Sequence, residues 1–183
     1  MQKILVHICC GPCYLYPYRI LNEEGFTVMG YFFNPNIHPF LEFKKRADTV
    51  KQLESQESRM GIIYDETYDL EKFLQSVAFR EDSRCIYCYH MRLKQAVITA
   101  RHGKFDCFST TLLYSKFQKH EIIREIAESL AKQYHVPFLY RDFREGWKEG
   151  IERSKKLELY RQPYCGCIYS ERDRYCQDKP SNS

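Results

Sequence analysis

Seven of the nine cysteines of the chain lie in three short clusters that are far apart in the sequence. The clusters read HICCGPC, RCIYCY and YCGCIYS, and they contain Cys9, Cys10, Cys13, Cys85, Cys88, Cys165 and Cys167. Thiolates are soft ligands, which favour iron-sulfur clusters, zinc or copper(I) over hard ions. Three clusters supply more thiolates than one tetrahedral zinc ion uses. The pattern therefore favours an iron-sulfur site and redox chemistry.

Two other interpretations of the cysteines stay open at this point. Free cysteine is among the most buried residue types, so a thiol can simply fill apolar space. That interpretation is favoured for Cys107 in the segment FDCFS, and Cys176 near the C-terminus is expected to be incidental. A structural zinc site without catalysis is the second alternative.

Small residues beside the cysteines affect where the sulfurs can point. Gly166 separates Cys165 from Cys167, and it tolerates backbone angles that would let both sulfurs turn toward one metal. Gly11 and Pro12 follow Cys10 and are expected to bend the chain, so that the first three sulfurs need not point the same way. Both segments thus suit a metal site.

The segment from residue 83 to residue 105 is basic and contains no acidic residue. Its cationic side chains are Arg84, Arg92, Lys94, Arg101 and Lys104. Such a stripe gains affinity for phosphates by releasing counterions, and Tyr87 and Tyr89 could stack on an unpaired base. A solvated helix face is the alternative. We expect this segment to bind RNA.

The remaining candidates for cofactor chemistry are weak. His7, His90 and His120 show no helical ligand spacing, so each is expected to be a satisfied or an exposed histidine. No glycine loop has the spacing that binds the phosphates of ATP or NAD. The chemistry is therefore expected to rest on the cysteines.

The bulk composition predicts one globular domain over residues 1–176 and a disordered polar tail over residues 177–183. The chain has 183 residues, a formal net charge of +4 and 44% hydrophobic residues. The N-terminal apolar run is too short to span a bilayer, and no export signal is visible. We therefore expect a cytoplasmic protein with no membrane partner, whose cysteines are ligands rather than disulfides.

Alternating apolar patterns predict the elements that position the cysteines. Strands are expected at Lys3–Ile8, Thr27–Phe33, 62–64, 105–109 and 137–140. Helices are expected up to residue 24 and at 40–60, Leu70–Val77, 87–100 and His120–Tyr134. This alternation predicts a single α/β domain with a doubly wound parallel sheet. Ligands bind such sheets at the carboxyl ends of the strands, where Cys9 and Cys10 follow the first strand.

Several longer segments carry a specific resemblance. They read HICCGPC, RCIYCYHMR, FSTTLLYS followed by HEIIREIAE, and EGIERSKKLELYRQPYCGCIYS. Together, in order over residues 3–170, they resemble the QueH family of epoxyqueuosine reductases. One departure is Lys116 after Ser115, where family members often have proline.

The resemblance implies a fold like the adenine nucleotide alpha hydrolases (HUP-like) and an enzyme that reduces the epoxide of epoxyqueuosine to queuosine in tRNA. It implies a 4Fe-4S cluster beside an additional iron ion, with all seven clustered cysteines as ligands. Cys10, Cys85 and Cys88, with Cys9 as a further candidate, are assigned to the cluster. Cys13, Cys165 and Cys167 are assigned to the second iron. Candidate proton donors are Tyr87, His90 and Tyr164, and the external electron donor is unknown.

Two rival functions use the same features. A zinc-stabilised tRNA-binding module would need the thiols and the basic segment but no redox chemistry. A tRNA sulfur-transfer enzyme would carry a persulfide on a cysteine, but it would normally need ATP. The identity of the bound metal separates these alternatives from the reductase.

Overall fold

The computed structural model describes residues 1–176, and its centre is a four-stranded parallel sheet. The strands are β1 Lys3–Ile8, β2 Thr27–Phe33, β3 Gly61–Asp65 and β4 Cys107–Thr110, and their order across the sheet is β3-β2-β1-β4. The chain winds from β1 through β2 to β3 and then returns to place β4 on the other side of β1. The winding direction thus reverses between β1 and β4, where such sheets bind ligands.

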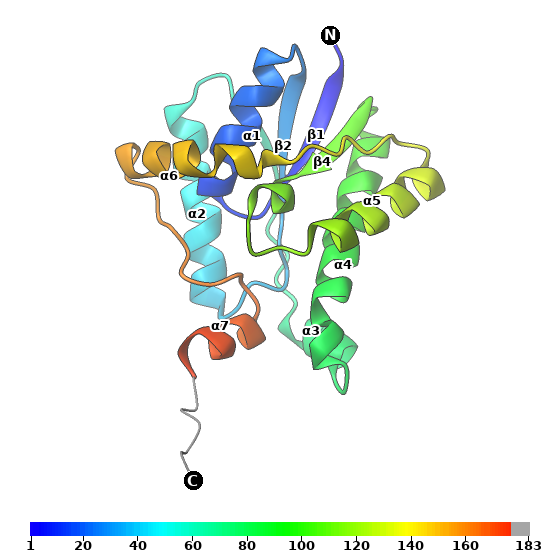
Figure 1. Ribbon diagram of the computed structural model, residues 1–183, viewed down its shortest axis with the longest axis vertical. Helices are drawn as coiled ribbons and strands as arrows, with labels where there is room; N and C mark the ends of the chain where they lie inside the picture. Colours follow the sequence, from blue (N-terminus) through cyan, green and yellow to red (C-terminus); the bar gives the residue numbers. More distant parts are fainter. Residues whose placement is uncertain (177–183) are drawn as a thin grey trace.

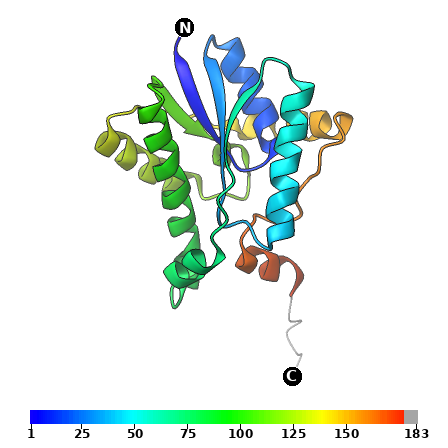
Figure 2. The same ribbon diagram turned by 180° about the vertical axis from the view of Figure 1, so that it is seen from behind.

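Seven α-helices surround the sheet in the described part of the chain. They are α1 Gly11–Glu23, α2 Phe40–Gln56, α3 Leu70–Val77, α4 Arg84–His102, α5 His120–Tyr134, α6 Trp147–Lys156 and α7 Ile168–Tyr175. Helices α1 and α2 lie on one face of the sheet, and α4 and α5 lie on the other (Figures 1 and 2). Helix α6 packs against α1, and α4 packs against α5. Three short 3-10 helices, Glu81–Ser83, Thr111–Tyr114 and Phe143–Gly146, complete the elements.

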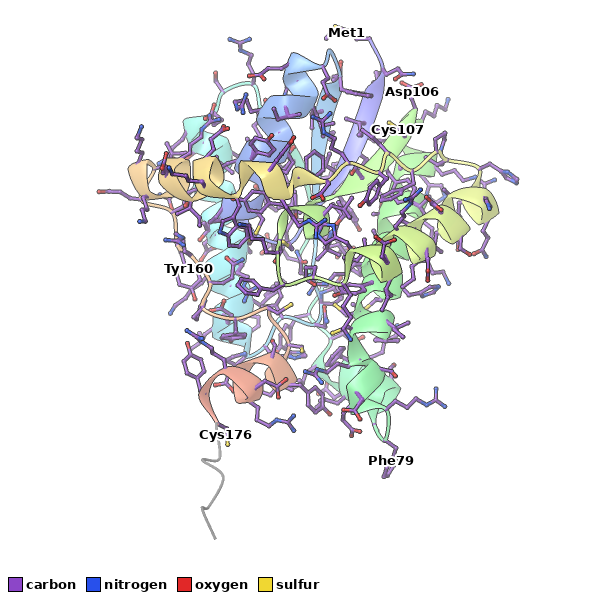
Figure 3. The ribbon with its side chains drawn as sticks, viewed as in Figure 1. Met1, Phe79, Asp106, Cys107, Tyr160 and Cys176 are labelled. Carbon is purple, nitrogen blue, oxygen red and sulfur yellow. The ribbon has the colours of Figure 1, made fainter. Side chains whose placement is uncertain are left out.

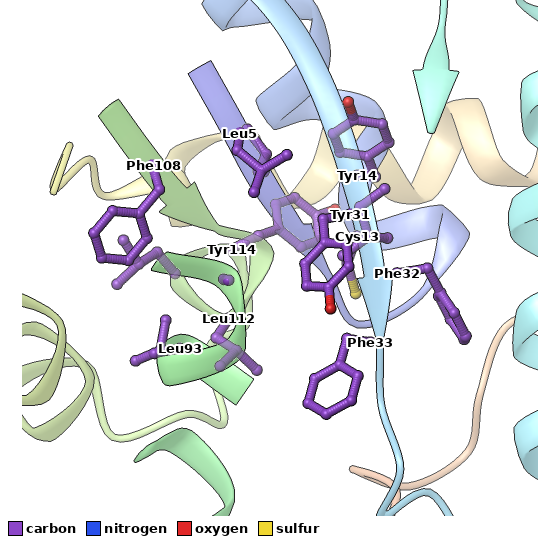
Figure 4. Close-up of a cluster of buried hydrophobic side chains, with 14 of the residues drawn as sticks. Leu5, Cys13, Tyr14, Tyr31, Phe32, Phe33, Leu93, Phe108, Leu112 and Tyr114 are labelled. Carbon is purple, nitrogen blue, oxygen red and sulfur yellow. The ribbon is translucent and has the colours of Figure 1, made fainter. Parts of the chain in front are cut away.

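The central strand β1 shows why these residues form a buried sheet. Every residue of KILVHI except Lys3 is buried, as expected for a parallel strand that is covered on both faces. Leu5 of β1 and Phe108 of β4 lie in the core with Leu93 of α4 and Leu112 of the following 3-10 helix (Figure 4). This core fixes the ends of β1 and β4, which carry the site.

Beyond the carboxyl ends of the strands lie α7 and the N-terminal part of α4. Met1 stands at one end of the molecule, and Phe79 and Cys176 stand at the opposite end (Figure 3). Arg84 of α4 joins α7 through an ion pair of 2.5 Å with Asp173, and its guanidinium lies over the ring of Tyr169. The second and third cysteine clusters are thereby held near one another.

The predicted doubly wound parallel α/β sheet is confirmed, with corrections to several of its elements. The helix expected at 40–60 ends at Gln56, because the chain turns there to enter β3. Helix α4 starts earlier than expected, at Arg84. The strand expected at 105–109 is Cys107–Thr110. Helices α6 and α7 were not predicted.

The fifth predicted strand, at 137–140, is wrong. The segment makes a single isolated bridge, between Phe138 and Phe108 of the edge strand β4. Pro137 has no backbone N–H to donate, so the pairing does not extend into a ladder. The tail predicted at 177–183 lies outside the described residues. None of the described helices has the length and apolarity that crossing a bilayer requires.

Candidate metal centre

Three cysteines meet where β1 passes into α1. The sulfur atoms of Cys9, Cys10 and Cys13 all lie within 4.8 Å of one another, and those of Cys9 and Cys10 are 3.9 Å apart. Cys10 is the residue that precedes α1, and Cys13 lies in its first turn. Among the described residues this is the one group of three or more metal-ligating side chains that is this close. The expected position of the first cluster, at the end of β1, is confirmed.

The surroundings of this group favour the thiolate form of one of its three cysteines, Cys9. The N-terminus of α1 carries a partial positive charge, which stabilises a nearby thiolate. Hydrogen bonds from Cys10 and Cys13, with a further one from Thr111, hold the pKa of Cys9 well below its ordinary value. Burial raises the pKa of Cys10, and hydrogen bonds to Cys10 and Cys9 together with burial raise that of Cys13. One thiol of the three ionises readily, and a bound cation would displace the other two protons.

Polar side chains from distant segments donate to these sulfurs. Oγ1 of Thr111 lies 3.2 Å from Sγ of Cys9, and it also accepts a hydrogen bond of 3.0 Å from the Cys9 backbone N–H. The amide Nε2 of Gln162 lies 2.9 Å from Sγ of Cys10 and 3.6 Å from Sγ of Cys13. Such partners orient ligands and tune a bound metal.

The loop of the third cluster is fastened to α2 by a buried arginine. Arg46 is 1% exposed and donates to Oε1 of Glu42 at 2.7 Å and to the carbonyl oxygen of Cys165 at 2.7 Å. Gly166 has a φ of 153°, a backbone angle that residues with a side chain rarely adopt. Its carbonyl oxygen accepts a hydrogen bond of 2.7 Å from the backbone N–H of His38. The unusual backbone angle expected at this glycine is therefore present.

The second cluster occupies the first turns of α4 and faces the third. Burial, opposed by the nearby Arg92 guanidinium and assisted by the neighbouring Cys165 and Cys167, raises the pKa of the Cys88 thiol to about 11. Gln118 connects the two clusters: it accepts from the Tyr89 hydroxyl at 2.7 Å, and its Nε2 lies 3.2 Å from Sγ of Cys165. All three clusters therefore lie around the carboxyl ends of the strands.

A cavity of about 580 Å³ opens onto the cysteines. Cys9, Cys13 and Cys165 line it, whereas Cys10, Cys85, Cys88 and Cys167 do not. Its other lining residues include Arg92, Leu112, Tyr114, Phe117, Trp147 and Arg161. A largely apolar wall with a few polar groups is typical of a ligand site.

Arg92 departs from the RNA-binding prediction. Its side chain is 3% exposed, and its Nε and Nη2 donate to Oδ1 of Asn36 at 3.0 and 2.7 Å. It therefore faces the cavity rather than an outer phosphate-binding surface. Of the other basic residues expected to bind RNA, Lys94, Arg101 and Lys104 are exposed, and Arg84 is paired with Asp173.

The histidines have structural surroundings, as expected. His7 is buried between Oγ1 of Thr110, at 2.9 Å, and the carbonyl oxygen of Phe33, at 3.0 Å, and burial lowers its pKa to about 4. His120 lies 3.1 Å from the carbonyl oxygen of Ser115, and His90 is exposed.

Of the three candidate proton donors, Tyr164 alone lines the cavity in the described part of the chain. Its hydroxyl donates to the carbonyl oxygen of His38 at 2.6 Å, and burial raises its pKa to about 12. The ring of Tyr87 instead packs near Phe73. Cys107 is buried in β4, as expected for a thiol that fills apolar space, and Cys176 is exposed near the C-terminus.

Sequence reasoning missed the polar residues that surround the sulfurs. Gln118, Gln162, Arg46 and Asn36 carry no local pattern that separates them from solvated residues. The one available signal was position: Gln162 lies three residues before Cys165 in a segment that the family resemblance already covered. Thr111 likewise follows the end of a predicted strand.

A family model and named relatives match most of the chain. The model of the family described as "Epoxyqueuosine reductase QueH" matches residues 4–173. Epoxyqueuosine reductase QueH of Dehalococcoides mccartyi is 40% identical over 174 residues, with 94% of each chain covered. The Thermotoga maritima protein of the same name is 33% identical, over 95% of this chain and 93% of its own.

A solved structure supports the fold. The predicted subunit of a tRNA methyltransferase from Methanocaldococcus jannaschii superposes with a TM-score of 0.54 at 15% identity, covering 85% of this chain and 75% of that one. At that identity the likeness concerns architecture alone. The family match spans nearly the whole chain and includes all three cysteine clusters, so the chain belongs to the QueH family of epoxyqueuosine reductases.

Proposed function

We propose that this chain reduces the epoxide of epoxyqueuosine in tRNA to the alkene of queuosine, using iron held by its clustered cysteines. The observation that carries the proposal is the group of Cys9, Cys10 and Cys13, whose sulfurs lie within 4.8 Å of one another beside a cavity. Membership of the reductase family supplies the substrate and the reaction class.

The donor set fits a metal. The site combines three close thiols, the N-terminus of α1 and side chains that donate to the sulfurs. This combination suits a soft, electron-accepting metal centre. The buried Nδ2 of Asn36 has no hydrogen-bond partner among the described residues, and it lies next to the Arg92 guanidinium. This free donor is available to a group bound at the site. When bound, a 4Fe-4S cluster would supply electrons singly, and an additional iron would supply a Lewis acid.

The cavity lining agrees with our division of the ligands for five of the seven cysteines, and differs for Cys9 and Cys167. Cys10, Cys85 and Cys88 do not line it, which suits a cluster that exchanges electrons but does not touch substrate. Cys9, Cys13 and Cys165 line it, which suits a metal with a position open to substrate. We assign Cys13, Cys165 and Cys167 to the second iron and Cys10, Cys85 and Cys88 to the cluster, with Cys9 as a further cluster candidate.

The reaction must balance two electrons and two protons. Both C–O bonds of the epoxide break, a C=C bond forms, and the oxygen leaves as water. An external reductant would supply the two electrons. The Arg92 guanidinium, fixed by Asn36, places a cation at the cavity, where negative charge develops on the departing oxygen. Tyr164 is our candidate for holding a proton there.

The tRNA must bring its modified base into the cavity while its phosphates stay outside. Lys94, Arg101 and Lys104 are exposed on or after α4, and we propose them, with Arg84, as phosphate contacts. Such a substrate, and the free thiols, suit a cytoplasmic protein.

Metal analysis of protein purified without oxygen tests the proposal. We expect several irons with acid-labile sulfide, a brown colour that air bleaches, and conversion of epoxyqueuosine tRNA when a reductant is supplied. Cys10→Ser should lose the iron, whereas Cys107→Ala, which removes a buried thiol from β4 outside the site, should keep it. Stoichiometric zinc without sulfide would favour a zinc-stabilised tRNA-binding protein. Persulfide transfer in place of reduction would favour a sulfur-transfer enzyme.

A further inference from the structure

Three aromatic rings form one wall of the cavity and extend to its mouth. Tyr114 stacks on Trp147 with 5.3 Å between ring centroids and 28° between planes. Phe117 meets Trp147 edge-on at 6.0 Å and 78°. All three line the cavity that Cys9 and Cys13 also line.

Burial in the core does not account for the position of Phe117. Its side chain is 83% exposed, so one face of its ring lies against solvent rather than core. It stands in the loop between the 3-10 helix Thr111–Tyr114 and α5. The neighbouring Lys116 lies over the Trp147 ring at 5.8 Å, so this loop holds a cation beside the aromatic rings.

The mouth is also positively charged. Lys116 and Lys119 flank Phe117 in the loop, and Arg161 and Arg174 line the cavity. None of these four cations forms an ion pair with another described residue. Asp173, the acidic residue of the lining, is already paired with Arg84 and Arg172. The charge at the mouth therefore complements an anionic partner.

Exposed aromatic rings bordered by cations are the combination that binds unpaired nucleotides, because the rings stack on bases while the cations contact phosphates. We propose that Phe117, supported by Trp147 and Tyr114, is a stacking platform for an unpaired base of the tRNA substrate at the mouth of the cavity. This proposal rests on the proposed function, since it names how the substrate of the same site is held.

The single tryptophan of the chain, Trp147, reports directly on this contact. A base stacked on Phe117 would lie next to the indole and change its fluorescence. Protein purified without oxygen would be titrated with an anticodon stem-loop RNA, and in parallel with the same stem closed by a loop whose wobble nucleotide is abasic. We expect saturable quenching of Trp147 by the first RNA, with weaker binding and less quenching by the second.

Variants of Phe117 separate stacking from apolar contact. Phe117→Ala and Phe117→Leu should weaken binding by about 5- to 150-fold, the range given by one base-stacking contact of roughly 1–3 kcal/mol. Phe117→Tyr keeps the ring and should bind like the unchanged protein. Phe79→Ala removes another exposed phenylalanine, which is 99% exposed and follows the C-terminal end of α3, and it should not change RNA binding. Kinetically, Phe117→Ala should raise KM and leave kcat unchanged.

The outcomes distinguish this platform from the proposed function. If Phe117→Ala binds RNA as tightly as the unchanged protein, or if RNA binding leaves Trp147 fluorescence unaltered, the platform is wrong even when epoxide reduction proceeds. If the unchanged protein shows the expected quenching but reduces no epoxyqueuosine, the platform stands and the proposed reaction is wrong. Iron and sulfide content should be equal in all four variants.

Discussion

The amide Nε2 of Gln162 lies 2.9 Å from Sγ of Cys10, although the two residues are 152 positions apart in the sequence. The same nitrogen lies 3.6 Å from Sγ of Cys13. Gln162 belongs to the segment between α6 and α7, so this contact joins the last part of the described chain to the end of β1. An N–H donor beside a thiolate stabilises its negative charge.

Replacing Gln162 by Leu should therefore weaken metal retention. Loss of a hydrogen-bonding partner of a ligand typically costs about 10- to 100-fold in metal affinity. The measurement is iron release to a competing chelator, without oxygen, as a function of chelator concentration. Gln52→Leu is the matched control, because Gln52 is exposed on α2 and donates only to the carbonyl oxygen of Leu157. Equal iron retention in both variants would show that the Gln162 contact does not act on the metal.

The cysteine pairs should differ in what they lose. We expect Cys85→Ser and Cys88→Ser to lose most sulfide and iron, because both are assigned to the cluster. Cys165→Ser and Cys167→Ser should keep much of the cluster but lose epoxide reduction, because they are assigned to the second iron. Sulfide and iron determination, together with single-turnover reduction, measures each effect. An equal loss of sulfide in all four variants would contradict the division and favour one undivided site.

The sequence was most informative where local pattern and tertiary structure agree. Strands β1 and β2 and helices α3 and α5 have the predicted bounds, because each is a short run with a clear apolar period. The position of Cys9 and Cys10 followed from β1 and from the rule for ligand sites in parallel sheets. The cysteine spacing then indicated the chemistry.

What could not be predicted depends on long-range contacts. Arg92 sits in a basic segment and reads as a surface cation, yet Asn36, 56 positions away, holds it in the interior. Residues 137–140 are apolar enough for a strand, but their neighbour β4 is short and Pro137 cannot donate a hydrogen bond. Helix α7 is polar, so no apolar period marks it, and contacts such as that of Tyr169 with Phe73 position it.

Arg46 should be essential to the stability of the third cluster's loop. Its ion pair with Glu42 is buried, and removing one partner of a buried pair costs about 3–5 kcal/mol, because the other charge stays without compensation. We expect Arg46→Met to lower the free energy of unfolding in urea by that amount. Arg124→Ala, which breaks an exposed pair with Glu128 on α5, should leave stability nearly unchanged. If both variants unfold at the same urea concentration, the buried pair does not fasten the loop.

The exposed and the buried basic residues of α4 should have different roles, the first in RNA binding and the second in catalysis. Lys94 and Arg101 are exposed, whereas Arg92 is 3% exposed and bonded to Asn36 beside the cavity. A phosphate contact releases counterions, so its loss lowers the slope of log affinity against log salt concentration by roughly one unit. The double variant Lys94→Ala, Arg101→Ala should therefore lower the slope for full-length tRNA by about two units and leave kcat intact. Arg92→Met should leave the slope unchanged and lower kcat, because its cation faces the substrate and not the phosphates.

Titrations of tRNA at several salt concentrations, with iron measured on each variant, test this contrast. The opposite result, an unchanged slope in the double variant, would place the phosphate surface elsewhere. The next candidates are then the basic residues of α6 and the segment after it, Arg153, Lys155, Lys156 and Arg161. Arg153 is already paired with Glu57, whereas Arg161 lines the cavity, so Arg161→Ala would be the first variant to titrate in that case. A fall in slope on replacing Arg92 would contradict the buried position of its side chain, because a guanidinium bonded to Asn36 inside the protein cannot release a counterion from a phosphate.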